Sequence, residues 1–223
     1  MKTLLVCAAR VKGSCTLVAR LAPNFDYVIA VDGGADICLE GGVTPDVLVG
    51  DLDSAGSNTV DTLIARGVPV VRYPAEKDAT DLELAIREAR RQGADEIVVT
   101  AATAGRLDHA LGALAALAAA ADLRPQLVDP DLSGWLLARD GRRELTLTGL
   151  GATVSLLPWG GIALVSARGV RWPVDRAEIG PESTRGVSNI ISSSEGGSFS
   201  LHQGTIFVIS PRGDLPPASK PSR

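Results

Sequence analysis

The chain has 223 residues, of which 45% are hydrophobic, enough for one domain or two small ones with a sizeable core. Its formal net charge of -4 and its pI near 5.2 argue against a surface that binds a nucleic-acid backbone, and no basic cluster offsets them. A small anionic nucleotide is still compatible with this charge, because a few local donors and a metal ion can override a weak overall field.

Three features indicate a cytoplasmic protein without a membrane segment. The N-terminus begins like a secretion signal, but its only early charge is Lys2 and its apolar run ends at Arg10, which favours a first buried strand. The most apolar stretch, residues 107–123, carries two aspartates and a histidine and is too short and polar to span a bilayer. The three cysteines are odd in number and lack metal-ligand spacing, so we expect reduced thiols.

Strand and helix patterns alternate over residues 1–130. The expected strands are mostly continuous apolar runs, as in a parallel sheet covered on both faces; they lie at 3–8, 27–31, 47–49, 68–72, 96–100 and 126–128. Helices are expected between them, among others at 57–66, 80–92 and 107–121. This alternation predicts an α/β domain with a doubly wound, mostly parallel sheet.

After Pro130 the helical periodicity disappears. Short strand-like runs separated by glycine and turn residues lie at 135–138, 144–148, 153–157, 163–167, 186–192, 198–202 and 206–209. That spacing predicts a small antiparallel sandwich or barrel. We therefore expect an α/β domain at 1–130, a C-terminal antiparallel β-sandwich at 131–211 and a disordered, proline-rich tail at 212–223.

Four polar clusters follow expected strands, at the edge where ligands bind in open α/β sheets. They are Asp32-Gly33-Gly34, Gly50-Asp51-Leu52-Asp53-Ser54, Lys77-Asp78-Ala79-Thr80-Asp81 and Gly105-Arg106-Leu107-Asp108-His109. Any one of these loops is compatible with an ordinary surface turn. Four on one rim are hard to explain by chance, and they predict a ligand site there.

The paired aspartates Asp51 and Asp53 are the candidate metal ligands. Mg²⁺ is held by one or two carboxylates, with water and substrate oxygens completing its shell, in enzymes that transfer phosphoryl groups. Taken alone, the pair more often indicates an Asp-rich surface turn than a metal site. Asp81 also has two interpretations, because an acidic residue at the start of a helix is stabilised by the helix dipole whether or not it binds a metal ion.

The remaining clusters also have two interpretations each. Gly33 and Gly34 either turn the chain between strand and helix or allow a nucleotide to approach the backbone, with Asp32 accepting from a ribose or base. Thr80 and Glu83 fit a capping box, which accounts for both without any function. Arg106 stands near a helix start, where it either binds a phosphate or pairs with Asp108, and His109 either packs or contacts substrate.

Two segments of the β half stand out. Trp172 lies in a turn flanked by glycine and proline, and it either belongs to the core or stacks on an aromatic ligand. Ser188 and Asn189 either serve a turn or bind the polar edge of a heterocycle.

With these clusters assembled, the chain resembles the thiamine pyrophosphokinase (thiamine diphosphokinase) family over about residues 3–210. The resemblance rests on the four clusters in order, on Glu83 and on the late Gly186-Val187-Ser188-Asn189. It implies transfer of pyrophosphate from ATP to the hydroxyethyl group of thiamine, with Mg²⁺ as cofactor and AMP as the second product. It also implies that the α/β domain binds ATP and metal, and that the β-sandwich helps form a thiamine site at a homodimer interface.

The resemblance further implies a role for each matching residue. Asp51, Asp53 and Asp81 become the metal and phosphate-site carboxylates, with Arg106 and Asp108 completing the catalytic set. The nucleotide would be bound by Asp32, Gly33, Gly34, Ser54, Lys77, Asp78, Thr80 and His109, and thiamine by Trp172, Ser188 and Asn189. The chain departs from the family pattern at Leu52, where phenylalanine is usual, at Ala104, a frequent glycine, and at Ile190, where many bacterial members carry glutamate.

Two rival functions are considered. A hydroxymethylpterin pyrophosphokinase shares the paired-aspartate signature, but the Ser188-Asn189 motif and the β half favour thiamine. A non-catalytic sensor of nucleotide or thiamine needs no metal carboxylates, so Asp51, Asp53 and Asp81 argue against it.

Overall fold

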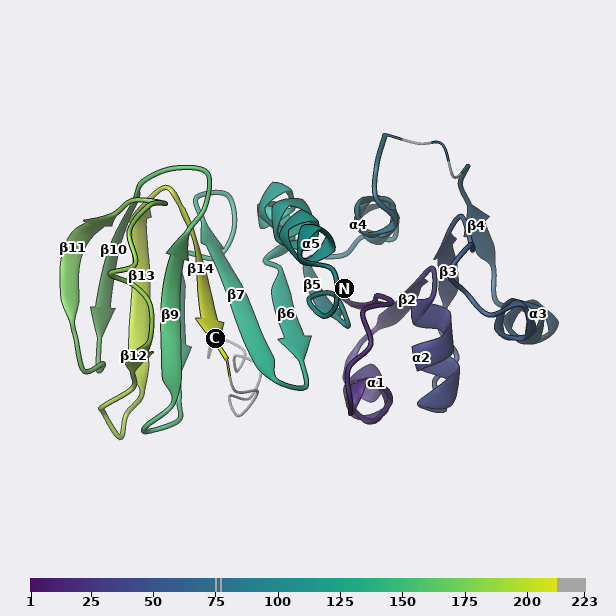
Figure 1. Cartoon of the computed structure of the whole chain (residues 1–223), viewed down its shortest axis with the longest axis horizontal. Coiled ribbons are helices and arrows are strands. Elements are labelled where there is room, and N and C mark those ends of the chain that lie inside the picture. The colour runs from purple at the N-terminus through teal and green to yellow at the C-terminus, as the bar shows by residue number, and fades with distance from the viewer. Residues whose placement is uncertain (75, 77, 212–223) are drawn as a thin grey trace. The chain divides into compact units, whose positions relative to one another are not determined.

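The computed structural model describes residues 1–74, 76 and 78–211, which form two compact units (Figure 1). The first unit comprises Met1–Leu123 and Leu127–Pro130, and the second comprises Arg124–Gln126 and the chain from Asp131 onward. The expected tail at 212–223 and the candidate ligand Lys77 lie outside the described residues. No helix in the described part of the chain is long and apolar enough to cross a membrane.

The first unit is built on a mostly parallel sheet. Its strands stand in the order β6 (Gln126–Asp129), β5 (Glu96–Thr100), β1 (Lys2–Val6), β2 (Tyr27–Val31), β3 (Val47–Gly50) and β4 (Val70–Arg72). The pairs β5–β1, β1–β2, β2–β3 and β3–β4 are parallel. The central strands are almost wholly buried, which is why their sequences read as continuous apolar runs. The predicted α/β fold class is confirmed.

Helices cover both faces of this sheet. Figure 1 shows α1 (Ser14–Leu21) and α2 (Gly34–Glu40) on one side of it and α4 (Asp81–Arg91) and α5 (Leu107–Ala119) on the other; α3 (Ser57–Ala65) packs against α2. Short 3-10 turns follow α1 at Ala22–Asn24 and α5 at Ala121–Leu123. The predicted capping box starts α4: Glu83 N donates to Thr80 Oγ1 over 3.3 Å, and Thr80 N donates to Glu83 Oε2 over 2.8 Å.

Two antiparallel groups of strands form the second unit. One has the order β11 (Val174–Ile179), β10 (Ala163–Arg168), β13 (Gly197–Gln203) and β8 (Glu144–Leu147). The other has the order β12 (Asn189–Ile190), β9 (Thr153–Pro158), β14 (Thr205–Ser210) and β7 (Leu132–Ala138). Both groups contribute to one apolar core, in which Trp135 of β7 and Phe199 of β13 are fully or almost fully buried. The two layers thus form the expected antiparallel sandwich.

Two expectations for the second unit were wrong in detail. The strand expected at 186–192 is reduced to β12, because Val187 N bonds back to Thr184 O in a turn and Ser188 adopts a left-handed φ of 62°. The edge strand β11 was not expected at all. Half of its sequence, Val-Asp-Arg-Ala-Glu-Ile, consists of exposed charged residues, and Arg176 within it has a φ of 44°.

Candidate active site

A cavity of about 720 Å³ lies in the first unit, where the chain leaves the carboxyl ends of β1, β2, β3 and β5. This volume is ample for a nucleotide-sized ligand. Residues from all four predicted clusters line it: Asp32, Asp51, Asp53, Ser54, Thr80, Asp81, Arg106, Asp108 and His109. The structure therefore brings together side chains from loops that are far apart in the sequence, Asp32 and His109 being the extremes. This is the edge at which open α/β sheets bind ligands.

Three carboxylates in this cavity can hold one metal ion. Asp32, Asp51 and Asp53 each offer an oxygen, and the three atoms lie within 4.8 Å of one another. Carboxylate oxygens in this number suit a hard divalent cation such as Mg²⁺. The family resemblance implied Asp81, rather than Asp32, as the third carboxylate beside Asp51 and Asp53. Asp81 lines the same cavity but is not part of the close triple, so its role as a metal ligand stays a prediction.

Asp32 is the most buried member of the triple, with 8% of its surface exposed. Its Oδ2 accepts a hydrogen bond from Ser54 Oγ, whereas its buried Oδ1 has no hydrogen-bond partner among the described residues. Burial raises the pKa of this carboxyl, the Ser54 bond lowers it in part, and the charges of Asp81, Asp53 and Asp51 raise it further. A cation bound by the triple would relieve this repulsion, so the residues present fit a divalent metal.

The turn between the paired aspartates has an unusual backbone. Leu52 is left-handed, with a φ of 70°, and Asp53 N donates to Asp51 Oδ1 over 3.3 Å. A residue with a Cβ seldom adopts this conformation unless its surroundings hold it there. Asp36 of α2 anchors the segment that follows, because its carboxylate accepts from Gly56 N over 3.1 Å and from the Thr59 hydroxyl.

The glycines after β2 have a structural explanation. A Cβ on Gly34 would lie 1.8 Å from the carbonyl oxygen of Val6, so only glycine lets α2 approach β1 this closely. Gly33 N donates to Ser54 Oγ over 3.2 Å. Neither glycine lines the cavity, and neither does the exposed Asp78. Their proposed contacts with a nucleotide stay predictions.

Arg106 and Asp108 form an exposed, two-point ion pair at the start of α5. Arg106 Nη2 lies 2.6 Å from Asp108 Oδ2 and Nε lies 3.1 Å from Oδ1. The guanidinium lowers the pKa of Asp108 to about 2. This is the pairing that the sequence left open as an alternative to phosphate binding. Both side chains line the cavity, so a phosphate entering it would compete with Asp108 for Arg106.

Cys7 also lines this cavity, although no motif in the sequence pointed to it. Burial raises the pKa of its thiol most, and the negative charges of Asp129 and Asp81 raise it further. It is a free cysteine and stays in the unreactive thiol form.

A second pocket, of about 410 Å³, lies in the β-sandwich unit. Trp172 and Asn189 line it, together with Arg171 and Arg185. Both arginines were missed as candidate residues, although Arg171 directly precedes Trp172 and Arg185 directly precedes the Gly186-Val187-Ser188-Asn189 motif. Trp172 is 55% exposed, which excludes the core interpretation. The Arg171 guanidinium lies over its ring, 5.0 Å from the centroid.

The amide of Asn189 holds the backbone of Trp172 in place. Its Oδ1 accepts from Trp172 N over 3.1 Å, and its Nδ2 donates to Trp172 O over 2.8 Å. Ser188 does not line the pocket; its backbone N donates to Ser155 Oγ over 3.0 Å. Asn189 thus supports the wall of the pocket, and contact of either residue with a substrate stays a prediction.

Comparison with known families gives two matches in chain order. Residues 18–128 match the family model described as thiamin pyrophosphokinase, catalytic domain, and residues 142–206 match thiamin pyrophosphokinase, vitamin B1 binding domain. The first match covers the strand ends that carry the carboxylates, and the second covers the pocket beside Trp172.

Individual proteins and structures agree with these matches. A thiamine pyrophosphokinase from Bacillus subtilis is 27% identical over 213 residues, covering 94% of this chain and 98% of the relative. Thiamine pyrophosphokinase 1 from Arabidopsis thaliana is 30% identical over 144 residues, which are 60% of this chain and 54% of that protein. The chain thus spans only about half of the plant relative.

Solved structures show the same architecture. The thiamin pyrophosphokinase from Geobacillus thermodenitrificans superposes with a TM-score of 0.77 at 26% identity, covering 96% of this chain and 99% of the other. The Bacillus subtilis enzyme has a TM-score of 0.80 at 24% identity, with 95% and 99% covered. Both domain models of one family match this chain in order, and together they cover more than half of the chain. The chain therefore belongs to the thiamine pyrophosphokinase family.

Proposed function

We propose that this protein transfers a pyrophosphate group from ATP to the hydroxyl group of thiamine, giving thiamine diphosphate and AMP. The observation that carries the proposal is the convergence of Asp32, Asp51 and Asp53 within 4.8 Å in a nucleotide-sized cavity at the carboxyl ends of a parallel sheet. Membership of the thiamine pyrophosphokinase family supports thiamine as the acceptor. We place this activity in the cytoplasm.

In this proposal Asp51 and Asp53 hold Mg²⁺ with Asp32 or Asp81. When bound, the ion neutralises charge on the phosphate oxygens of ATP. The buried Oδ1 of Asp32 has no hydrogen-bond partner in the described part of the chain, which supports this assignment, because an anionic oxygen in that position gains most from a cation.

For the transfer itself, the protein mainly has to orient the two substrates and stabilise the negative charge on the phosphates. The thiamine hydroxyl attacks the β-phosphorus of ATP in line. A new oxygen–phosphorus bond forms there, and the bond from the β-phosphorus to the oxygen that bridges it to the α-phosphorus breaks, so that AMP leaves with this oxygen. Arg106 steadies phosphate oxygens with its planar fork of donors. Asp81 or Asp108 accepts the hydroxyl proton. Arg106 lowers the pKa of Asp108 to about 2, which makes Asp108 a poor base as long as the two are paired. Lys77 stays a candidate phosphate ligand from the sequence alone.

Thiamine is proposed to stack on Trp172, in a site completed by a second copy of the chain. The half-exposed indole in a pocket with an apolar floor supports stacking of an aromatic ring. The family resemblance supports a homodimer, and Ser188 and Asn189 are assigned to this site on the same basis.

An acceptor competition assay tests the function. Purified protein is incubated with ATP, Mg²⁺ and either thiamine or a hydroxymethylpterin, and AMP and the diphosphate product are quantified. We expect AMP to form with thiamine and not with the pterin, and we expect Asp51→Asn to lower the rate about a hundredfold or more with an unchanged far-UV CD spectrum. AMP release with the pterin alone would assign the rival function, and no AMP with either acceptor would support a non-catalytic sensor.

A further inference from the structure

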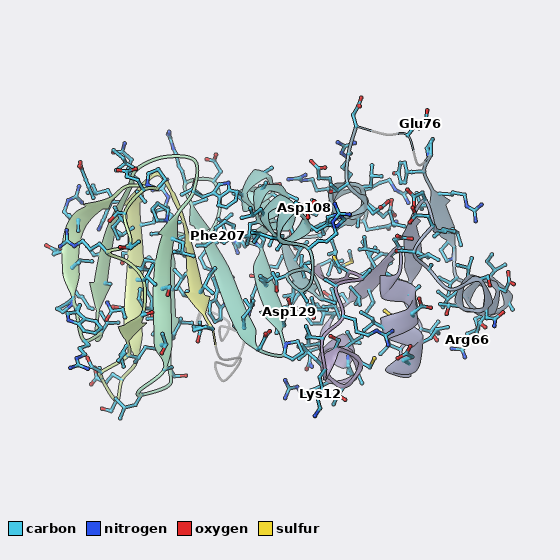
Figure 2. All side chains as sticks on the ribbon, in the orientation of Figure 1. Lys12, Arg66, Glu76, Asp108, Asp129 and Phe207 are labelled. Atoms are coloured by element: carbon cyan, nitrogen blue, oxygen red, sulfur yellow. The ribbon has the colours of Figure 1, made fainter. Side chains whose placement is uncertain are left out.

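Asp129, the last residue of β6, is a buried carboxylate that the proposed chemistry does not use. Only 3% of its surface is exposed, and it does not line the cavity. Figure 2 labels its side chain at the end of β6. Asp129 Oδ1 accepts from Ala101 N over 2.5 Å and from Thr100 Oγ1 over 3.4 Å, and Oδ2 accepts from Thr103 Oγ1 over 2.6 Å. All three donors belong to the end of β5 or to the loop that follows it.

That loop forms one wall of the cavity. Ala102, Ala104 and Arg106 line the cavity, and α5 begins directly afterwards at Leu107. A carboxylate has two oxygens that both accept, so Asp129 can bind a peptide N–H and a hydroxyl of the same loop at once. Asp129 therefore holds the conformation of this loop without lining the cavity itself.

Ala101 transmits this restraint to a second loop. It is fully buried and left-handed, with a φ of 53°, a conformation that residues with a Cβ avoid unless it is held in place. Its N–H is held by Asp129, while its carbonyl oxygen accepts from Ala9 N over 2.7 Å. Ala9 follows β1 and lines the same cavity. Ala101 thus joins the loop after β5 to the loop after β1.

We propose that Asp129 is a positioning residue of the nucleotide cavity, which acts by fixing these two loops against each other. The proposal rests on the proposed function in that it takes ATP to be the occupant of this cavity. Asp129 touches no substrate in this role. Its loss lets the loop after β5 relax from the left-handed turn at Ala101, and Arg106 then loses its orientation toward the phosphates.

Two substitutions of Asp129 separate positioning from simple destabilisation. Asp129→Ala removes all three hydrogen bonds. Asp129→Asn keeps an oxygen for Ala101 N and supplies an N–H that can donate to the Thr103 hydroxyl, so it restores the geometry without the charge. Thr103→Val removes a single bond and serves as the milder variant if Asp129→Ala does not fold.

Glu88→Ala is the matched control. Glu88 is also a buried carboxylate of the first unit, 4% exposed, and it accepts from Arg91 Nε over 2.8 Å and from Gln92 Nε2 over 2.8 Å. It does not line the cavity. A loss of nucleotide affinity that merely reflects a less stable first unit will appear in this variant as well.

The experiment measures the affinity of a non-hydrolysable ATP analogue with Mg²⁺ by calorimetry, the melting temperature, and KM for ATP and thiamine. We expect Asp129→Ala to weaken analogue binding and to raise KM for ATP, each about tenfold. In Thr103→Val and Asp129→Asn the two quantities should change by less than about threefold. Glu88→Ala should leave analogue binding and KM for ATP unchanged. KM for thiamine should stay constant throughout.

The positioning role is overturned if Asp129→Ala weakens analogue binding no more than Glu88→Ala does, or if Asp129→Asn and Asp129→Ala behave alike. It is likewise overturned if Thr103→Val is without effect while Asp129→Ala is unfolded, or if the wild type does not bind the analogue. Wild-type protein that binds the analogue but forms no thiamine diphosphate refutes the proposed function only, since the binding series still tests Asp129.

Discussion

The hydroxyl of Ser54 donates a hydrogen bond to one carboxylate oxygen of Asp32, while the other oxygen of Asp32 is buried without a hydrogen-bond partner among the described residues. Asp51 and Asp53 each bring an oxygen within 4.8 Å of the same carboxylate. An ionised Asp32 is therefore unfavourable in the metal-free protein, and the same feature suits it to a cation.

Replacing Asp32 by asparagine should make the metal-free protein at least as stable as wild type, and it should reduce the stabilisation that Mg²⁺ provides. The amide of Asp32→Asn keeps an acceptor oxygen for Ser54 but removes the like charge. We expect melting temperatures at pH 7 in EDTA to be equal to or above wild type, and the rise caused by Mg²⁺ with an ATP analogue to be largely lost. Asp36→Asn is the control, because Asp36 bonds Gly56 and Thr59 outside the cavity. An unchanged response of Asp32→Asn to Mg²⁺ would refute the metal assignment.

The stability difference between Asp32→Asn and wild type should depend on pH. Because the folded-state pKa of Asp32 is raised, the folded protein holds this proton more tightly than the unfolded chain does. The ionisation of Asp32 therefore lowers the free energy of unfolding once the pH exceeds the ordinary pKa of the carboxyl, near 3.8. This loss grows until the pH passes the raised pKa of the folded state, and it is constant above that. In EDTA, the advantage of Asp32→Asn over wild type in urea unfolding should grow across this window and then level off. An advantage that shrinks with rising pH would contradict the electrostatic account.

Gly34→Ala should severely destabilise the first unit. The added Cβ would lie 1.8 Å from Val6 O, and backbone atoms cannot move aside as a flexible side chain does. We expect a loss of about 3 kcal/mol or more in urea unfolding. The control is Gly112→Ala in α5, where a Cβ meets nothing within 4 Å and helix propensity favours alanine by about 0.5–1 kcal/mol. Equal stability of the two variants would show that α2 can move away from β1 without cost.

Trp172→Ala should raise KM for thiamine about tenfold, because an exposed ring that stacks on a ligand contributes binding energy on the order of 1 kcal/mol. Its 55% exposure predicts little change in melting temperature. Ile162→Ala, at a residue 57% exposed in the same unit and outside the pocket, controls for loss of surface apolar area. Asn189→Ala should raise KM in the same direction, because it removes the bonds that hold the Trp172 backbone. A normal KM in Trp172→Ala would move the thiamine site elsewhere.

Mixing two impaired variants tests whether the active site is shared between copies of the chain. Asp51→Asn disables the metal site and Trp172→Ala the thiamine pocket. In a homodimer whose sites combine both subunits, a refolded equal mixture contains one intact site in each mixed dimer, or about a quarter of all sites. Activity should return to about that fraction at thiamine concentrations well below the KM of Trp172→Ala. No recovery, although mixed dimers form, would place each site within one subunit.

Much of the fold was predictable because its signals are local. The runs at 27–31 and 96–100 were expected with the bounds that β2 and β5 have, since a strand buried on both faces must be apolar throughout. The capping box at Thr80 and Glu83 is equally local, as both partners lie within one helical turn. The edge strand β11 was missed for the corresponding reason: with one face in solvent and a left-handed Arg176, its sequence carries no continuous apolar run.

The order of most strands and helices, and the set of polar loops at the carboxyl edge of the parallel sheet, could thus be predicted from local sequence patterns. Two further features depend on the folded arrangement: Asp32 joins Asp51 and Asp53 in the close triple, and Asp129 holds the loop after β5. The physical reason is that these contacts depend on which strands are neighbours and on left-handed turns at Leu52 and Ala101. No residue propensity encodes either, since both are imposed by packing between segments that are distant in the chain.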